Sequence, residues 1–187
     1  MAARGGRRCA ATTEGLFVDD GAGFRPRRLG GPSSNDVTAL AVDGAGKRLA
    51  IGTFEDGLTI RDGRALARPA GIEANETVNA ATWQGDTLWV GTYAKGVTRL
   101  ALGGAEPVAT HLGGGYVNAG GIVLRGGTVH VATMEHLLTR PTDDDAAAWT
   151  SLRGAATGRD VTQIAHVGGE TWVASRRGIA IHRGRPW

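Results

Sequence analysis

Two short patterns recur along the chain with a spacing near 40 residues. The first is an apolar run that ends in a small residue and a hydroxyl, as in LWVGTYAKGV at 88–97. Its hydroxyl residues are spaced by 41, 39, 41 and 42 positions, at Thr12, Thr53, Thr92, Thr133 and Ser175. The second pattern is marked by a valine, with spacings of 41, 39 and 44, at Val37, Val78, Val117 and Val161. Two patterns with one period predict stacked copies of a single supersecondary unit.

Each unit has the pattern of several short strands separated by tight turns. Within 35–63, VTALAV alternates in polarity, LAIGT is apolar, and LTIRDG follows as a third run. The turns between them, DGAGKR and FEDG, contain the glycine and aspartate that hairpins require. A less regular fourth segment follows, as in EPVATHL. No window of about 12 residues has the apolar spacing of a helix, so the sequence predicts an all-β chain.

Four antiparallel strands in a repeat of about 40 residues are typical of a β-propeller blade. We predict one propeller domain over 1–187, with about five blades in units near 1–34, 35–75, 76–114, 115–158 and 159–187. The first and last blades are predicted to be incomplete, because only MAARGGRR precedes Cys9 and the chain stops at RGRPW. The predicted tally is 18 strands, whereas five closed blades of four need 20. Strand edges left open in this way predict self-association.

The repeated residues have predicted structural roles. A blade is covered by neighbours on both faces, so its second strand can be apolar on both sides. Trp89 and Trp172 are predicted to be buried in equivalent positions, and His130 to pack between blades in the same position. The hydroxyl residues are expected to bond the amides of the following turn. The small residues are expected where the backbone of the next blade comes close, at Ala11, Gly52, Gly91, Ala132 and Ala174.

The runs LWVGTYAKGV at 88–97 and TWVASRRGI at 171–179 resemble the two-component regulator propeller repeat, whose signature is approximately G-x-L-W-I-G-T-x-x-G-L. The resemblance extends over nearly the whole chain and is strong in two units. It implies a β-propeller that senses a ligand outside the cytoplasm, in front of a signalling module, with carbohydrates among the ligands. No kinase or other output module is found in this sequence, and blade four departs from the pattern with Leu137 in place of glycine.

Composition narrows the remaining classes of function. The net charge of +3 is spread over turns, so we expect no nucleic-acid partner. No apolar run approaches the length of a membrane span, so none is expected. We also expect no cofactor and no metal, because the chain has one cysteine, no HExxH spacing, and an Asp143–Asp145 run without the glycine of calcium loops. The basic start has no apolar run, which favours the cytoplasm, whereas the family resemblance favours an extracytoplasmic place.

Loops that precede the first strands and loops that join the second and third strands are expected to meet on one face of the ring. Mixed charges and aromatic rings in these loops suit a small polar ligand, a carbohydrate or a peptide. We therefore predict a non-catalytic sensing propeller, with a protein-interaction scaffold as the alternative. A propeller lyase or hydrolase that uses Glu135 and His136 is the weaker third candidate. The candidate ligand-binding residues are Phe54, Glu55, Tyr93, Lys95, Tyr116, Glu135, His136, Arg176 and Arg177.

Overall fold

The computed structural model describes residues 2–4, 7–27, 35–63, 65–152 and 160–183, and these form five antiparallel sheets. The first sheet contains β1 (Ala2–Arg4), β2 (Arg7–Thr12), β3 (Gly15–Asp19) and β4 (Phe24–Arg27). The second contains β5 (Val37–Val42), β6 (Arg48–Thr53), β7 (Leu58–Asp62) and β8 (Ala65–Ala67). The third contains β9 (Val78–Gln84), β10 (Thr87–Thr92), β11 (Gly96–Ala101) and β12 (Val108–Gly113). The fourth contains β13 (Val117–Arg125), β14 (Thr128–Thr133), β15 (Leu137–Pro141) and β16 (Thr150–Leu152), and the fifth β17 (Val161–Val167), β18 (Glu170–Ser175) and β19 (Gly178–His182).

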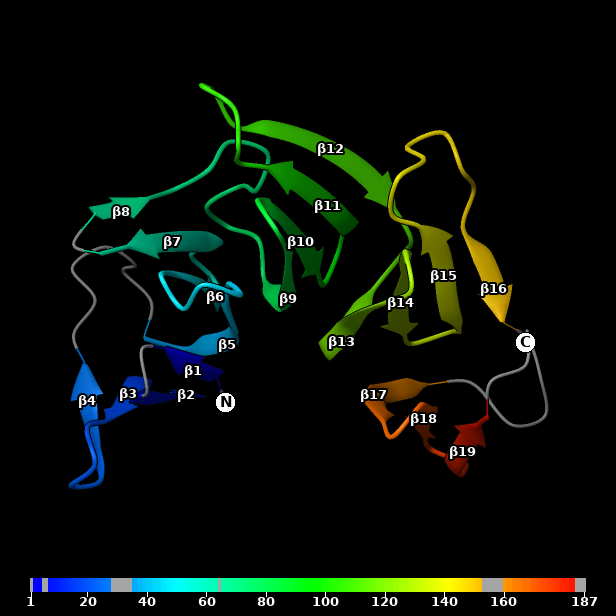
Figure 1. Ribbon diagram of the computed structural model, residues 1–187, viewed down its shortest axis with the longest axis horizontal. Coiled ribbons are helices and arrows are strands. Elements are labelled where there is room, and N and C mark those ends of the chain that lie inside the picture. Colours follow the sequence, from blue (N-terminus) through cyan, green and yellow to red (C-terminus); the bar gives the residue numbers. More distant parts are fainter. Residues whose placement is uncertain (1, 5–6, 28–34, 64, 153–159, 184–187) are drawn as a thin grey trace.

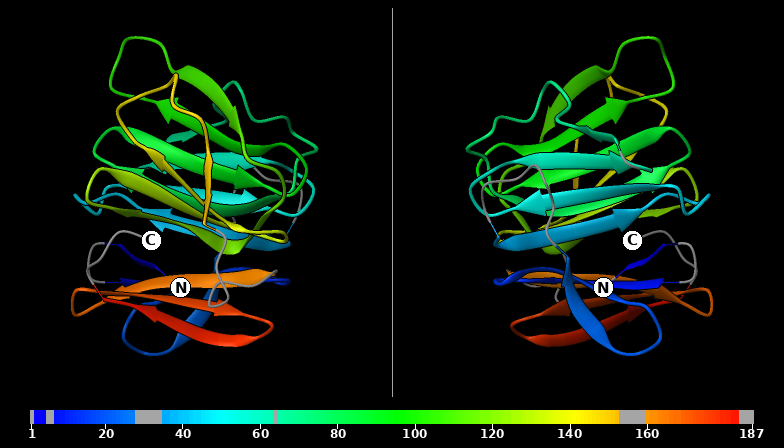
Figure 2. Two further views of the ribbon diagram at one scale, coloured as in Figure 1. Left: turned by 90° about the vertical axis from the view of Figure 1, so that its right-hand side faces the viewer. Right: turned by 90° about the vertical axis from the view of Figure 1, so that its left-hand side faces the viewer.

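The sheets follow one another around an arc, as the blades of a propeller do (Figure 1). Each sheet places its first strand toward the centre and its later strands progressively outward. The inner strands pack in series, β5 against β9, β9 against β13 and β13 against β17. The first and fifth sheets form the two ends of this arc, and both lie on the same side of the molecule (Figure 2). The described residues contain no helix that is long and apolar enough to cross a membrane.

The first sheet differs from the prediction. We expected three strands there, yet β1 pairs with β2 in antiparallel register, Ala2 opposite Cys9 and Arg4 opposite Arg7. The tally is therefore 19 strands in the described residues rather than 18. Strands pair through hydrogen bonds between backbone groups, and an edge strand tolerates basic side chains well. The basic composition of residues 2–4 is therefore compatible with the pairing of β1 with β2. This strand is nonetheless only 3 residues long, whereas β9 has 7.

The valine of the second pattern packs against the small residue of the preceding sheet. A Cβ atom built on Gly52 would lie 2.5 Å from a methyl group of Val78. The same construction on Gly91 gives 2.5 Å to a methyl group of Val117. We had expected the backbone of the next blade at this place, but the close approach is made by a side chain. The two sequence patterns have the same period because each contact between sheets needs one residue from each pattern: the small residue of one sheet and the valine of the next.

The residue after three of the four marker valines links neighbouring inner strands through its side chain. Thr38 donates its hydroxyl hydrogen to the carbonyl oxygen of Val78 at 2.5 Å. The side-chain amides of Asn79 and Asn118 donate to the carbonyl oxygens of Val117 and Val161 at 2.8 and 2.6 Å. A hydrogen-bonding side chain at this position therefore joins the inner strand of one sheet to that of the next.

Equivalent positions of the second strands differ in burial. Trp89 is 1% exposed and packs in the cluster between the third and fourth sheets. His130 is also buried, as predicted, and its ring meets that of His166 edge-on at 5.3 Å. The prediction was wrong for Trp172, which is 36% exposed. This position faces the following sheet, and in the described residues no sheet follows the fifth.

Candidate functional site

The turns that join the second and third strands are closed by the repeated hydroxyl. In the second sheet the Thr53 hydroxyl accepts the amide hydrogen of Asp56 at 3.0 Å and donates to the carbonyl oxygen of Gly57 at 3.2 Å. Thr92 makes the same pair of bonds, with the amide of Lys95 and the carbonyl of Gly96. The pattern extends to Thr12, Thr133 and Ser175. The predicted role of the hydroxyl is confirmed in all five sheets, and we call the side where it lies the hydroxyl face.

Backbone bonds on the hydroxyl face tie each turn to the neighbouring links. The amide of Phe54 donates to the carbonyl of Asp36 at 3.0 Å, and the Thr77 hydroxyl donates to the carbonyl of Phe54 at 2.6 Å. The amide of Tyr93 in turn donates to the carbonyl of Thr77 at 2.9 Å. The backbone is fixed in this way while the side chains of Phe54 and Tyr93 stay 49% and 52% exposed. A rigid backbone that presents exposed aromatic rings is suited to recognition.

Two of the exposed rings form a pair across neighbouring sheets. Tyr93 follows β10 in the third sheet, and Tyr116 precedes β13 in the fourth. Their centroids are 5.1 Å apart with the planes tilted by 45°. The two residues are 52% and 48% exposed, so the pair lies on the surface rather than in the core.

A pocket of about 260 Å³ lies beside this pair and contains three of the predicted residues. Tyr116, Glu135 and His136 line it together. The amides of Glu135 and His136 both donate to the Thr133 hydroxyl, at 3.3 and 2.9 Å, which fixes the turn that carries them. The pocket thus combines an aromatic ring, a carboxylate and an imidazole, a set that can hydrogen-bond and stack with a polar ligand.

Part of this pocket was missed by the sequence reasoning. Met134, Gly114 and Leu138 also line it. Three consecutive glycines at 113–115 take positive φ angles of 69°, 101° and 74°, a backbone that residues with a Cβ rarely adopt. A Cβ on Gly114 would also lie 3.3 Å from the ring of Trp149. The GGG run was therefore a readable signal for an unusual link at this place.

Lys95 is exposed, and its ammonium group forms two ion pairs with the protein. Its ammonium group lies 2.7 Å from Glu73 and 2.9 Å from Glu76, in the link that precedes β9. The hydrogen bond to Glu73, followed by the one to Glu76, raises the pKa of Lys95 above its usual value. Lys95 therefore braces the turn against the link.

The remaining predicted residues lie outside this pocket. Phe54 and Glu55 belong to the second sheet and are exposed. Arg176 and Arg177 are exposed in the fifth sheet, where Arg176 pairs with Asp160 at 3.1 Å. Asp160 takes a positive φ of 57° and donates its amide to the carbonyl of Met134 at 2.8 Å, which connects the fifth sheet to the pocket turn. Among the described residues, no group of three or more His, Cys, Asp or Glu is arranged to hold a metal ion.

Comparisons with known proteins agree on the architecture. A domain described as the extracellular domain of a hybrid two-component system from B. thetaiotaomicron superposes with a TM-score of 0.74 at 19% identity, over 96% of this chain and 27% of that one. A second such domain from the same organism gives 0.69 at 17%, over 97% and 26%. The β-propeller domain of Cps50 (Swd1) from Myceliophteria thermophila gives 0.66 at 14%, over 89% and 58%. The fold is that of a β-propeller.

The chain spans about a quarter of the length of the two-component system domains that it matches. No protein-family model matches the sequence, and no curated protein matches it. The predicted resemblance to two-component regulator propellers therefore agrees with these structures in fold, while their identities with this chain stay below 20%.

Proposed function

We propose that the protein is a non-catalytic, ligand-sensing propeller that binds a small polar ligand, a carbohydrate or a peptide, on its hydroxyl face. The supporting observation is the Tyr93–Tyr116 pair beside a pocket that contains Glu135 and His136. Aromatic faces stack on the apolar side of a sugar ring or a peptide side chain, while a carboxylate and an imidazole hydrogen-bond its polar groups. The extracellular two-component system domains of the same fold support a sensing role and an extracytoplasmic place.

The ligand is proposed to make most of its contacts at the junction of the third and fourth sheets. Tyr93, Tyr116, Glu135 and His136 form the centre of the site. Phe54, Glu55, Arg176 and Arg177 are proposed to contact only a longer ligand that extends along the hydroxyl face. Lys95 is proposed to act by positioning, because its two ion pairs occupy its ammonium group.

The experiment is a glycan-array and peptide-array screen, followed by calorimetric titration of any hit. Tyr116→Ala should weaken binding by tenfold or more, because aromatic groups at the centre of a site carry much of its binding energy. Tyr93→Ala should have an effect of similar size. Asp143→Ala, an exposed position outside the pocket, serves as the matched control. Loss of binding in Asp143→Ala with none in the two tyrosine variants would refute the placement.

A second candidate function, protein interaction, is favoured by the outer face of the fifth sheet. Trp172 pairs with Ile181 and Ala174 with Ile179, so these side chains share one face. Ile179 and Ile181 are 67% and 42% exposed, and together they form an exposed apolar patch on one face of β19. In the other sheets this face is covered by the next blade. We propose that a further blade covers this outer face of the fifth sheet. A second copy of the chain can supply that blade.

A further inference from the structure

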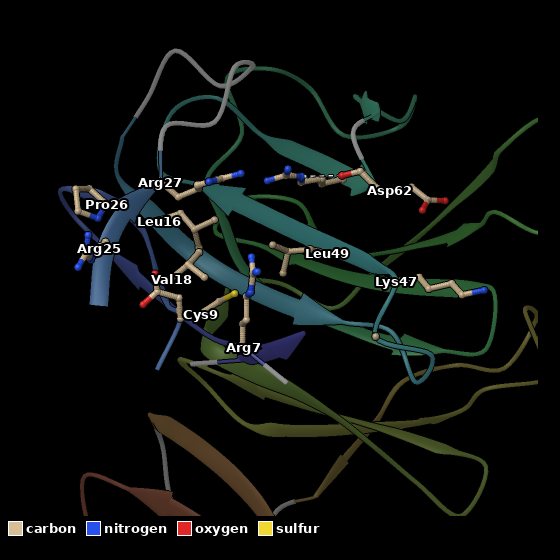
Figure 3. Close-up of a pocket in the computed structure, with 14 residues that line it drawn as sticks. Arg7, Cys9, Leu16, Val18, Arg25, Pro26, Arg27, Lys47, Leu49 and Asp62 are labelled. Atoms are coloured by element: carbon tan, nitrogen blue, oxygen red, sulfur yellow. Dashed lines mark hydrogen bonds between the residues drawn. The ribbon is translucent and has the colours of Figure 1, made fainter. Parts of the chain in front are cut away.

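A large cleft separates the first and second sheets, and it runs from the turn at Lys47, opposite the hydroxyl face, to Leu16 and Arg27 beside the Thr12 turn. Its volume is about 770 Å³, within the range of ligand sites in proteins. The turn between β5 and β6 borders it through Lys47, and the end of β7 through Asp62 (Figure 3). Its floor is apolar and consists of Cys9, Leu16, Val18 and Leu49. None of its lining residues belongs to the pocket of the hydroxyl face.

The cleft exists because the first interface lacks the ring that fills each later one. Each interface between neighbouring sheets is filled from two positions. The first is the position of Trp89 in the second strand of one sheet, and the second is the position of Leu124 in the first strand of the following sheet. The second and third sheets meet through Ala50 and Trp83, and Trp89 fills the next interface with Leu124. His130 and His166 fill the last one. At the first interface the same two positions are Cys9 and Val42. Both are small, and space remains between the sheets.

Three arginines of the first sheet share the face that borders the cleft. Arg7 precedes Cys9 by two residues in β2, and alternate residues of a strand point to the same side. In β4, Arg25 pairs with Val18 and Arg27 with Leu16, so they lie on that side too. Figure 3 shows the Arg7 side chain between Val18 and Leu49 and the Arg27 side chain above Leu16, and both residues line the cleft.

Arg25 is a special feature of the first sheet, whereas the position of Arg7 is occupied by another arginine, Arg48, in the second sheet. The positions equivalent to Arg25 in the next three sheets are the neutral residues Ala67, Thr110 and Thr150. Several other arginines of this protein have carboxylate partners, such as Arg48 with Asp43 at 2.9 Å. By contrast, Arg7, Arg25 and Arg27 have no ion-pair partner among the residues that the structure describes. Lys47 and Arg61 also line the cleft, against two carboxylates, Asp20 and Asp62.

We propose that this cleft binds a small organic anion that carries an apolar body, such as an aryl carboxylate or an aryl sulfonate. The apolar body would contact Leu16, Val18 and Leu49, and the acid group would accept hydrogen bonds from Arg7 and Arg27. A guanidinium matches a planar or tetrahedral acid group in two parallel hydrogen bonds. The neutral floor and the cationic rim together select this class over a neutral apolar molecule and over an inorganic anion.

The test is a fluorescence titration with anilinonaphthalene sulfonate, an aryl sulfonate that brightens in apolar surroundings. The neutral N-phenylnaphthylamine and inorganic sulfate serve as comparison ligands and should bind at least tenfold more weakly. Cys9→Trp fills the cleft in the way that Trp89 fills its own interface, and binding should be lost while the protein stays folded by circular dichroism. If Cys9→Trp does not fold, Cys9→Leu replaces it, with a partial loss expected.

Charge and location are tested with matched variants. The double variant Arg7→Ala/Arg27→Ala should weaken the sulfonate about tenfold, because two partly exposed ion pairs contribute modestly. Arg183→Ala, at an exposed arginine that follows β19, should leave binding unchanged. Ile179→Glu checks the other exposed apolar face and should leave the cleft signal intact. Full binding in the double arginine variant, or in the cleft-filling variant, overturns the proposal, as does loss of binding in Ile179→Glu alone.

Discussion

Replacement of Trp89 by alanine tests the packing between sheets most sharply. Trp89 is 1% exposed and packs in one cluster with Val97, Val117 and Val129. These neighbours are held in strands of two sheets, so they cannot collapse far into the space that the ring leaves. Removal of a buried tryptophan costs about 3–5 kcal/mol in such surroundings. The hydrogen bond from its indole to Gln84 adds little, because Gln84 is exposed and regains water.

The matched control is Trp172→Ala, the same substitution at the equivalent position of the fifth sheet. Trp172 is 36% exposed, so its loss should cost about 1 kcal/mol or less. Urea-induced unfolding followed by far-UV circular dichroism measures both free energies of unfolding without depending on tryptophan fluorescence. Equal losses of stability in the two variants would refute the claim that a following sheet makes the difference between these positions.

Three further predictions concern packing, pH and association. Gly91→Val places a Cβ 2.5 Å from a methyl of Val117, so the free energy of unfolding should fall by about 1–3 kcal/mol, and adding Val117→Ala should restore part of it. Burial, with smaller effects of His166 and Arg125, lowers the pKa of His130 to about 4. The unfolded chain therefore binds a proton that the folded chain does not, and stability should fall from about pH 6.5 toward pH 4 by up to about 3 kcal/mol. His130→Phe should flatten this dependence in pH-resolved thermal melts, and an unchanged slope would contradict the assignment. Ile179→Glu should lower the average mass seen by light scattering in a concentration series, whereas a monomeric parent chain would exclude self-association through this face.

The repeat explains why so much of the fold could be predicted from the sequence. Thr53 and Thr92 lie at one phase of the period because each closes a turn, and Val78 and Val117 lie at another because each packs on a glycine of the preceding sheet. These contacts are made once per unit, so the sequence repeats them. The repeat also predicts which face carries the candidate site, because the turns that follow the repeated hydroxyl residues all lie on one face.

The features that could not be predicted depend on contacts between units. The exposure of Trp172 depends on whether another sheet follows, which its own repeat does not encode. The ion pairs of Lys95 come from Glu73 and Glu76 in a link of irregular sequence. The cleft at Cys9 reflects a pair of positions on two strands, and neither residue alone indicates a cavity.

The central claim, that ligands bind at the junction of the third and fourth sheets on the hydroxyl face, is tested most directly by NMR. The protein labelled with ¹⁵N is titrated with the strongest hit from the glycan and peptide arrays, and the amide shifts are mapped on the sequence. The largest changes are expected at Tyr93, at 114–116 and at 133–136. Changes that concentrate elsewhere, for example at 43–47 beside the cleft, with none at Tyr116, would contradict it.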